Sequence, residues 1–174
     1  NCIGYSAPEG KQDTRMVQDA RQINDRIEKC SFPLPRIDDL IQRLAGYSYF
    51  SVFDLKKGYF QIPVAKESRK YLGFKTSFGY YQFKKMPMGL ATAPGEFQQF
   101  MQKVLGAYFG VCALVFLDDI IVFSKTYEEH KKHVEAVLTE LDKVGLTVSL
   151  EKSKFGATKL KYLGFEVSRE GIRP

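Results

Sequence analysis

The chain has 174 residues, 44% of them hydrophobic and 14% aromatic, which is enough to bury the core of one globular domain. Its formal net charge of +6 is compatible with a polyanionic partner such as nucleic acid. No apolar run approaches the roughly 18 residues of a membrane span, and no secretion signal is visible. The three cysteines, an odd number without metal-like spacing, indicate little beyond a reducing compartment.

The first third of the chain predicts a loop, a strand, a helix and a second strand. Residues 1–14 are polar and contain Gly and Pro, so a loop is expected there, and residues 15–25 predict a short strand followed by a turn. Residues 32–44 place two prolines ahead of apolar residues at helical spacing, which predicts a helix. Residues 47–55 are aromatic and β-branched, and predict a strand that is buried on both faces.

The middle of the chain predicts short strands followed by a long helix. Two β-like segments are expected near residues 60–64 and 71–76, and a further strand at 78–85. A helical pattern begins at about Ala93, where Pro94 is tolerated because it falls in the first turn.

The last third predicts a hairpin, a helix and two closing strands. Residues 126–145 form an amphipathic pattern in which Thr126 and Glu129 have the spacing of a capping box. Strands are predicted at residues 146–150 and 159–168. Helices and strands mix without strict alternation, so the predicted class is α+β, with a mainly antiparallel sheet packed on helices.

Three aspartates are the strongest candidates for chemistry. Two apolar runs in residues 111–125 are separated only by Asp118 and Asp119, which predicts a tight hairpin with these two residues at its turn. A solvated acidic turn is one interpretation. The other takes in Asp54, near the end of another apolar strand, because three clustered carboxylates repel one another until divalent cations bind. Two such cations about 4 Å apart serve phosphoryl transfer.

Seven segments, in order along nearly the whole chain, resemble blocks of a known enzyme family. They are RMVQDARQIN, FPLPRIDDL, FSVFDLKKGYFQI, FGYYQFKKMPMGLATAPGEFQ, FLDD, GLTVSLEKSKF and KYLGF. Their order and wording resemble the reverse transcriptase of gypsy-type LTR retrotransposons, encoded in a Metaviridae-like pol polyprotein. The resemblance implies a palm with a partial fingers subdomain.

The resemblance also implies a catalytic centre. Asp54, Asp118 and Asp119, with the backbone carbonyl of Leu55, would bind Mg²⁺, with Mn²⁺ as an alternative ion. Lys152 stands where the family has a lysine proposed as general acid for the pyrophosphate leaving group, although a solvated surface lysine is the plainer interpretation.

Further residues are implied in nucleotide and primer binding. They are Arg15, Leu55, Tyr59, Met88 and Gly89 for the nucleotide, and Leu163 and Gly164 for the primer grip. A guanidinium such as that of Arg15 matches phosphate oxygens. The ring of Tyr59 would exclude a 2′-hydroxyl, with a core tyrosine as the alternative.

The remaining acids and the histidines are given structural roles. Asp19 and Arg21 are expected to form an internal ion pair. The Asp38–Asp39 pair falls at a helix start, where acids complement the dipole. His130 and His133 have a spacing that can hold zinc, but no further ligand accompanies them, so an exposed helix face and a packing position are expected, respectively.

The expected organisation is one fingers/palm domain over residues 1–174. Residues 1–46 and 60–85 would be fingers-like, and residues 47–59 and 86–174 would form the palm. Thumb, connection and RNase H segments are expected to be absent, so this chain alone should show weak or no processive synthesis.

The expected function is RNA-directed and DNA-directed DNA polymerisation by two-metal nucleotidyl transfer. The alternative is a domesticated domain that serves as a protein- or RNA-binding scaffold without turnover. Expected partners are an RNA or DNA template-primer, dNTPs and the rest of a pol polyprotein (thumb, RNase H, integrase), with a homodimer as a further option and no membrane. The expected location is the cytoplasm, with virus-like particles as an alternative setting.

Overall fold

The computed structural model describes residues 2–6, 14–29 and 32–174, with side chains from residue 17 onward. The chain divides into two compact units. The first comprises residues 1–31 and 57–96, and the second comprises residues 32–56 and 97–174.

A four-stranded antiparallel sheet forms the centre of the second unit. Its strand order is β6-β7-β3-β8. The strands are β3 (Tyr49–Leu55), β6 (Ala113–Phe116), β7 (Asp119–Ser124) and β8 (Val148–Ala157). A strand buried on both faces was predicted for residues 47–55, and β3 confirms it, with Phe50, Ser51 and Phe53 fully buried.

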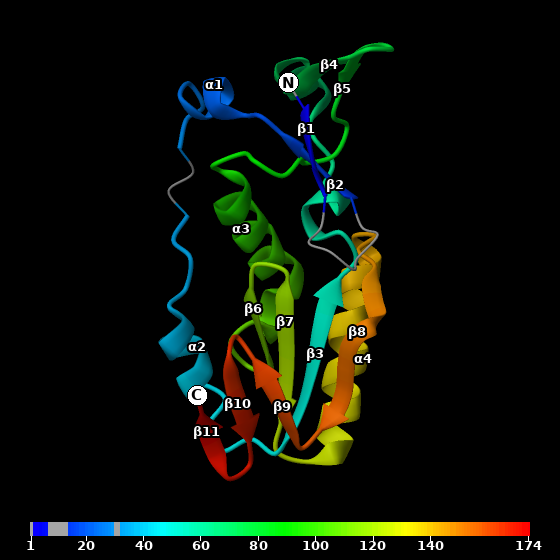
Figure 1. The fold of residues 1–174 in the computed structure, drawn as a ribbon. Coiled ribbons are helices and arrows are strands. Elements are labelled where there is room, and N and C mark those ends of the chain that lie inside the picture. The colour runs from blue at the N-terminus through cyan, green and yellow to red at the C-terminus, as the bar shows by residue number, and fades with distance from the viewer. Residues whose placement is uncertain (1, 7–13, 30–31) are drawn as a thin grey trace. The chain divides into compact units, whose positions relative to one another are not determined.

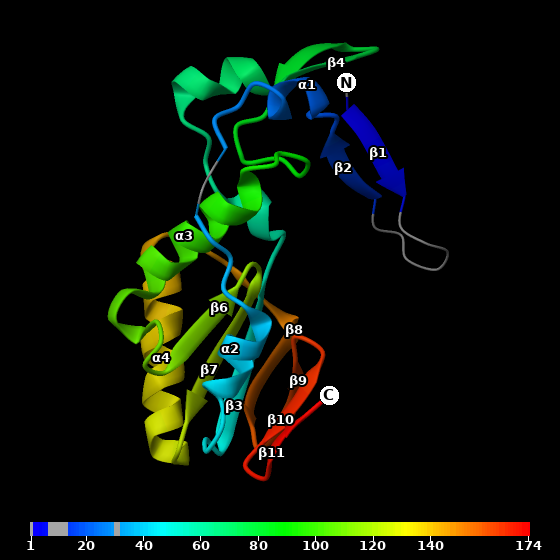
Figure 2. The same cartoon turned by 90° about the vertical axis from the view of Figure 1, so that its left-hand side faces the viewer.

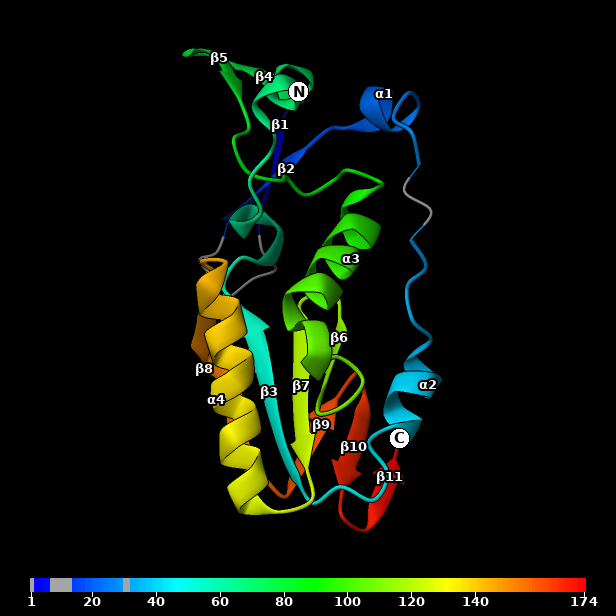
Figure 3. The same cartoon turned by 180° about the vertical axis from the view of Figure 1, so that it is seen from behind.

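Helices and a small second sheet cover the two faces of this central sheet. Figure 3 shows α4 (Tyr127–Lys143) in front of the sheet beside α3 (Ala93–Leu105), whose residues from Phe97 onward belong to this unit. Figure 1, from the opposite side, shows the antiparallel sheet β9-β10-β11 in front. Its strands are β9 (Lys159–Tyr162), β10 (Phe165–Ser168) and β11 (Gly171–Arg173).

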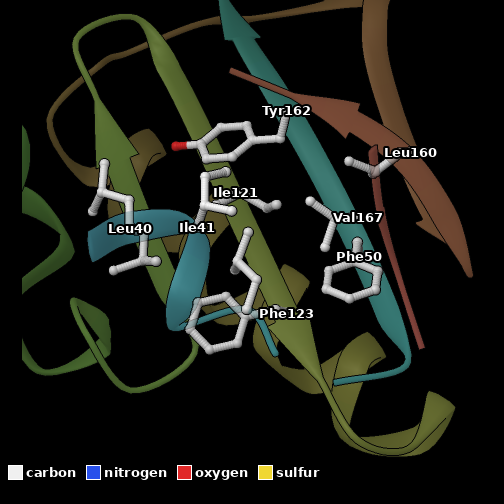
Figure 4. Packing of buried hydrophobic residues seen from close by; sticks show 10 residues of the cluster. Leu40, Ile41, Phe50, Ile121, Phe123, Leu160, Tyr162 and Val167 are labelled. Atoms are coloured by element: carbon white, nitrogen blue, oxygen red, sulfur yellow. The ribbon is translucent and has the colours of Figure 1, made fainter. Parts of the chain in front are cut away.

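One hydrophobic cluster of this unit lies between the central sheet and the small sheet. Side chains from α2 (Ile37–Gln42), β3, β7, β9 and β10 meet there (Figure 4). Because strand side chains alternate between faces, Phe50, Ile121 and Phe123 share this face, while Ser51, Ile120 and Ser124 point to the other. Burial of this apolar surface is the main term holding the unit together.

The two long helices begin where the sequence predicts. In α4, Thr126 Oγ1 accepts a hydrogen bond from the Glu129 amide at 3.3 Å, and the Glu129 carboxylate accepts one from the Thr126 amide, which completes the capping box. Helix α3 starts at Ala93, with Pro94 in its first turn as predicted. A short 3₁₀ helix, η3 (Gly106–Tyr108), follows α3.

In its described residues, the first unit contains two strand pairs, a short helix, two 3₁₀ helices and the first turn of α3 (Figure 2). Strands β1 (Cys2–Ser6) and β2 (Thr14–Gln18) pair in antiparallel fashion, as do β4 (Gly73–Thr76) and β5 (Gly79–Gln82). The helices are α1 (Arg21–Asn24), η1 (Gly58–Gln61) and η2 (Lys66–Leu72).

Several local predictions were wrong. A loop was predicted for residues 1–14, but β1 forms there by pairing with β2. No strand forms at 60–64, where the first two residues end the 3₁₀ helix η1 and Pro63 makes only an isolated bridge to Lys85. The strand predicted at 71–76 begins at Gly73, after η2. Residues 159–168 form a hairpin, because Leu163 and Gly164 both adopt positive φ and reverse the chain.

The overall class is as predicted. The protein is α+β, and every strand pair within its sheets is antiparallel. In the described part of the chain, no helix has the length and apolar character that crossing a bilayer requires.

Candidate active site

Asp54 and Asp119 face each other on neighbouring strands of the central sheet. They are direct register partners in the β3–β7 pair. Side chains of directly opposed residues project from the same face, with Cβ atoms about 4.5–5.5 Å apart. Two partly buried carboxylates therefore lie side by side, on the face that also carries Phe50 and Ile121.

Asp118 lies in the tight turn immediately before Asp119. The sequence predicted a turn made by the two aspartates, and this was wrong by one position. Phe116 and Asp119 are paired, so Leu117 and Asp118 form the turn and Asp119 begins β7. Leu117 adopts a φ of +52°, which is costly for a bulky residue and places strain next to the carboxylates.

Gln98 of α3 holds this turn in place. Its amide nitrogen donates to the Val115 carbonyl at 2.9 Å, and its amide oxygen accepts from the Leu117 amide at 2.8 Å. Gln98 is fully buried, so both hydrogen bonds form away from competing water. One side chain thus fixes the strained turn, through its first residue, Leu117, and through Val115 two residues earlier.

Tyr162 supports Asp119 from the small sheet. Its hydroxyl donates to the Asp119 carbonyl oxygen at 3.3 Å. The ring is buried, and burial, followed by repulsion from Asp119, raises the pKa of the Tyr162 hydroxyl well above its usual range. The hydroxyl therefore stays protonated and serves as a donor.

Strand β8 brings Lys152 toward Asp54 through an irregularity. Val52 pairs with Lys154 and Asp54 pairs with Ser149, so an advance of two residues along β3 corresponds to five residues along β8. The extra residues include Lys152, whose Nζ lies 3.9 Å from Asp54 Oδ1 with its side chain 63% exposed. Bulges of this kind commonly re-aim side chains next to active sites.

A serine repairs the hydrogen bonding that this bulge interrupts. The Asp54 amide donates to Ser153 Oγ at 3.3 Å, and that hydroxyl donates to the Ser149 carbonyl at 2.7 Å. The backbone at Asp54 is therefore tied to β8 although the regular ladder is broken. Leu55, the next residue, is buried and pairs with Val148.

The carboxylates carry an excess of negative charge. Burial, and then repulsion from Asp54, raises the pKa of the Asp119 carboxyl above its ordinary range. Among the described residues, no group of three or more His, Cys, Asp or Glu side chains is already arranged to hold a metal ion. The donor chemistry nevertheless suits a hard divalent cation, since it consists of carboxylate oxygens that repel one another.

Leu163 and Gly164, predicted as primer-grip residues, form the two-residue turn between β9 and β10. Their φ values are +49° and +90°, as a type I′ turn requires. This unit therefore contains Asp54, Leu55, Asp118, Asp119, Lys152, Leu163 and Gly164.

The predicted nucleotide-binding residues Met88 and Gly89 lie in a loop of the first unit that is pinned to β2. The Gln18 amide donates to the Met88 carbonyl at 3.2 Å, and a Cβ on Gly89 would lie 2.5 Å from the Gln18 carbonyl oxygen. Only glycine fits there, at a φ of +108°. The close backbone approach expected of Gly89 is therefore made to the protein's own strand.

Asn24 fixes the same loop from α1. Its side chain donates to the Gly89 carbonyl and accepts from the Ala91 amide, each at 2.9 Å. Tyr59 is partly buried in η1 of this unit. Arg15 belongs to β2, and its side chain lies outside the described residues.

Sequence reasoning missed Gln98, Ser153 and Asn24. Each acts through hydrogen bonds to residues far away in sequence, such as the 99 positions that separate Ser153 from Asp54. One local signal was available for Gln98. It lies among the apolar residues of α3 that face the core, and a buried amide needs hydrogen-bond partners.

The structural roles given to other polar residues are largely confirmed. Arg21 and Asp19 form a two-pronged ion pair with distances of 2.9 and 2.7 Å, and this pair lowers the pKa of Asp19 to about 2. Asp38 and Asp39 occupy the first turn of α2.

The exposed position predicted for His130 was wrong. The imidazole is buried, with Nε2 2.7 Å from Ser51 Oγ and Nδ1 3.0 Å from Ser124 Oγ. Its neighbour His133 is partly buried and contacts Ser124 Oγ at 2.8 Å. The two buried hydroxyls of the sheet need partners, and His130 satisfies both.

The family model described as reverse transcriptase (RNA-dependent DNA polymerase) matches residues 7–167 of this chain. A putative enzymatic polyprotein of Cassava vein mosaic virus is 38% identical over 91% of the chain. The retrovirus-related Pol polyprotein from transposon opus of Drosophila melanogaster is 36% identical over 95% of it. The chain spans 24% and 17% of these two relatives, and such relatives agree with the gypsy-type group that the sequence resembles.

Solved structures with the same fold come from a foamy virus. Its protease-reverse transcriptase in complex with an RNA/DNA hybrid matches 99% of this chain at a TM-score of 0.86 and 28% identity. The form in complex with double-stranded DNA matches at a TM-score of 0.89 and 27% identity. The chain covers 23% and 30% of those two chains. This chain belongs to the reverse transcriptase family.

Proposed function

We propose that this chain is the core of an RNA-directed and DNA-directed DNA polymerase that extends a primer 3′-hydroxyl with dNTPs. The observation that carries the proposal is the direct pairing of Asp54 with Asp119, beside Asp118 in a strained, clamped turn. Strain held by buried hydrogen bonds is typical of functional sites.

The carboxylates of Asp54, Asp118 and Asp119, with the Leu55 carbonyl, would hold divalent cations, Mg²⁺ or alternatively Mn²⁺. When bound, a pair of such cations stabilises the charge on the attacking and leaving oxygens of a phosphoryl transfer. The raised pKa of Asp119 supports this role, since a cation would offset the repulsion from Asp54.

The protein's own side chains supply the other functions. Lys152, close to Asp54 but largely exposed, would donate a proton to the leaving pyrophosphate. Arg15, Tyr59, Met88 and Gly89 would bind the nucleotide, with Tyr59 discriminating against a 2′-hydroxyl. Leu163 and Gly164 would position the primer from their type I′ turn.

This function requires a template-primer, dNTPs and the rest of a polyprotein. The foamy virus relatives were solved with an RNA/DNA hybrid and with double-stranded DNA, which supports both kinds of template here. The proposal includes a cytoplasmic or virus-like-particle setting and admits a homodimer. Because the chain is a small part of its relatives, weak and distributive synthesis is expected from it alone.

Primer extension on an RNA and a DNA template, with Mg²⁺ or Mn²⁺, tests the proposal. Incorporation should be at least 100-fold lower in the Asp118→Asn/Asp119→Asn variant, since an electrostatic group of this kind contributes about 10²–10³-fold. The matched control is Asp38→Asn/Asp39→Asn, which neutralises another adjacent pair, at the start of α2. This control should extend primers like the unmodified chain.

Equal activity in all three proteins would contradict the proposal. If none of them extends a primer, calorimetric titration with Mn²⁺ decides. Binding that the Asp118→Asn/Asp119→Asn variant loses would support the metal site, while absence of binding would favour a scaffold without turnover.

A further inference from the structure

The β4–β5 hairpin of the first unit presents large aromatic rings to solvent. Phe78 at its tip is 89% exposed, Tyr80 is 80% exposed, and Tyr71 at the end of η2 is 64% exposed. Exposed apolar surface of this density on two successive elements marks an interaction site more often than a structural one.

The two faces of the hairpin have different roles. On one face Phe74 lies opposite Tyr81, with ring centroids 5.8 Å apart, and contacts the buried Phe83 at 4.9 Å. On the other face Lys75 lies opposite Tyr80, with its Nζ 5.4 Å from the ring centroid. The first face packs the hairpin through Phe74 and Phe83, so Tyr80 on the second face and Phe78 at the tip are available for a partner.

The tip that carries Phe78 is internally fixed. The Phe78 amide donates to Thr76 Oγ1 at 3.1 Å, and that hydroxyl donates to the Gly79 carbonyl at 3.3 Å. An aromatic residue on a fixed turn loses little conformational entropy when it binds.

The hairpin and the preceding 3₁₀ helix are strongly basic. Residues 66–85 contain six Lys or Arg and one Glu, a net charge of +5 in a chain whose total is +6. Lys66, Lys70, Lys75 and Lys84 are exposed, and Lys70 also lies over an aromatic ring, that of Tyr71, at 5.0 Å. The positive charge therefore surrounds the exposed rings.

We propose that this surface binds single-stranded nucleic acid, with unpaired bases stacked on Phe78 and Tyr80 and phosphates beside Lys70 and Lys75. Basic grooves interleaved with aromatic rings bind single strands because every base has a face for stacking. A duplex offers no such faces along its length, since its bases stack on one another. The inference deepens the proposed polymerase function, on which it rests in that a template ahead of the primer is single-stranded, but the binding itself requires neither metal nor dNTP.

A similar ring–lysine pair elsewhere provides a matched control. On α4, Tyr127 is 51% exposed and the Lys131 Nζ lies 5.4 Å from its ring centroid. There, however, Lys131 is paired with Glu128 at 2.9 Å, and Glu129 is adjacent in sequence. The ring geometry is alike but the local positive charge is neutralised, so this pair should not bind a polyanion.

The test compares two fluorescein-labelled twelve-mers, oligo-dT and an abasic strand of the same length, by fluorescence anisotropy in EDTA. Phe78→Ala/Tyr80→Ala should weaken oligo-dT binding about tenfold or more, because each stacked base contributes substantially to affinity. Binding of the abasic strand should change less than about twofold, since its phosphate contacts remain. Tyr127→Ala should change neither affinity, and Phe78→Trp/Tyr80→Trp should keep the preference for oligo-dT.

Two further variants separate the phosphate contacts of the hairpin from its stacking, and the hairpin from the proposed catalytic centre. Lys75→Ala should weaken the binding of both oligo-dT and the abasic strand, and it should reduce the salt dependence of binding by about one released counterion. Asp118→Asn/Asp119→Asn should keep the preference for oligo-dT over the abasic strand, since its substitutions lie in the other unit.

If Phe78→Ala/Tyr80→Ala weakens the binding of oligo-dT and of the abasic strand equally, base stacking on these rings is ruled out. If it weakens the binding of neither strand, the hairpin is not the binding site. If the double variant instead abolishes self-association in sedimentation while leaving both affinities intact, the hairpin is a protein contact and the proposal is wrong.

Discussion

Asp119 is a residue whose charge opposes folding. Its carboxyl pKa is raised, first by burial and second by Asp54, so the folded state binds this proton more tightly than the unfolded state. Stability contributed by protonation is therefore lost as the pH rises through the folded pKa, and at neutral pH the full penalty applies. Asp119→Asn should raise the Tm, because the amide has no charge to be penalised by burial or by Asp54, while abolishing primer extension.

The measurement is thermal unfolding at pH 7.5, first with EDTA and then with a saturating Mg²⁺ concentration of about 10 mM. The unmodified chain should gain stability from the cation, and the variant should gain much less, because a ligand stabilises only a state that binds it. A Tm that falls in the variant without metal would show that Asp119 stabilises the fold.

The β6–β7 hairpin depends on Gln98 for its strained turn. Gln98→Leu removes both hydrogen bonds, to Val115 and to Leu117, and leaves one buried and one partly buried backbone group without these partners. We expect a loss of about 2–4 kcal/mol in unfolding free energy and a fall in kcat of at least about tenfold, because Asp118 moves with the turn.

Gln102→Leu, one turn along α3, serves as the control for changes in helix packing. The amount of Mg²⁺ that gives half-maximal extension should rise in Gln98→Leu and stay constant in Gln102→Leu. An unchanged Mg²⁺ requirement in Gln98→Leu would mean that the glutamine stabilises the hairpin without positioning its aspartate.

Elements with strong local signals were predictable from sequence. The capping box at Thr126 and Glu129 and the aromatic run of β3 are satisfied by neighbours in sequence, so pattern alone locates them. The β9–β10 turn was not recognised, because leucine is not a residue that favours turns, although Leu163 adopts a φ of +49° there. Its conformation is imposed by pairing of the two strands.

The residues of the candidate site also fall into those that could be predicted from local sequence and those that could not. The three aspartates stand out because acids at the ends of apolar strands are unusual, and their family blocks are recognisable. The bulge that carries Lys152 and the serine that repairs it arise from pairing between β3 and β8, almost 100 residues apart in sequence. Such long-range register is invisible to reasoning based on local periodicity.

The second unit as a whole is tied together by a buried polar network around His130. Its imidazole joins α4 to Ser51 of β3 and Ser124 of β7, and Ser51 Oγ also accepts from the Gly156 amide of β8 at 2.9 Å. Four elements thus meet at one titratable group. Burial, and then the neighbouring His133, lowers the pKa of His130, so the folded state keeps the ring neutral.

This network predicts how stability depends on pH. The unfolded chain takes up a proton on His130 below its ordinary pKa of about 6.5, whereas the folded chain resists it. Stability is therefore complete above pH 6.5 and is lost as the pH falls toward the folded pKa, by up to about 1.4 kcal/mol per pH unit. Urea unfolding between pH 7.5 and 5.5 measures this slope.

The comparison with two variants isolates the group responsible. His130→Gln should be less stable at pH 7.5 by about 1–3 kcal/mol, because its amide cannot satisfy both serines equally well, and its slope should be flatter. His133→Gln removes the partly buried neighbour and should retain most of the slope. If the slope survives in His130→Gln and disappears in His133→Gln, the proton is taken up by His133, and the buried imidazole of His130 does not cause the pH dependence.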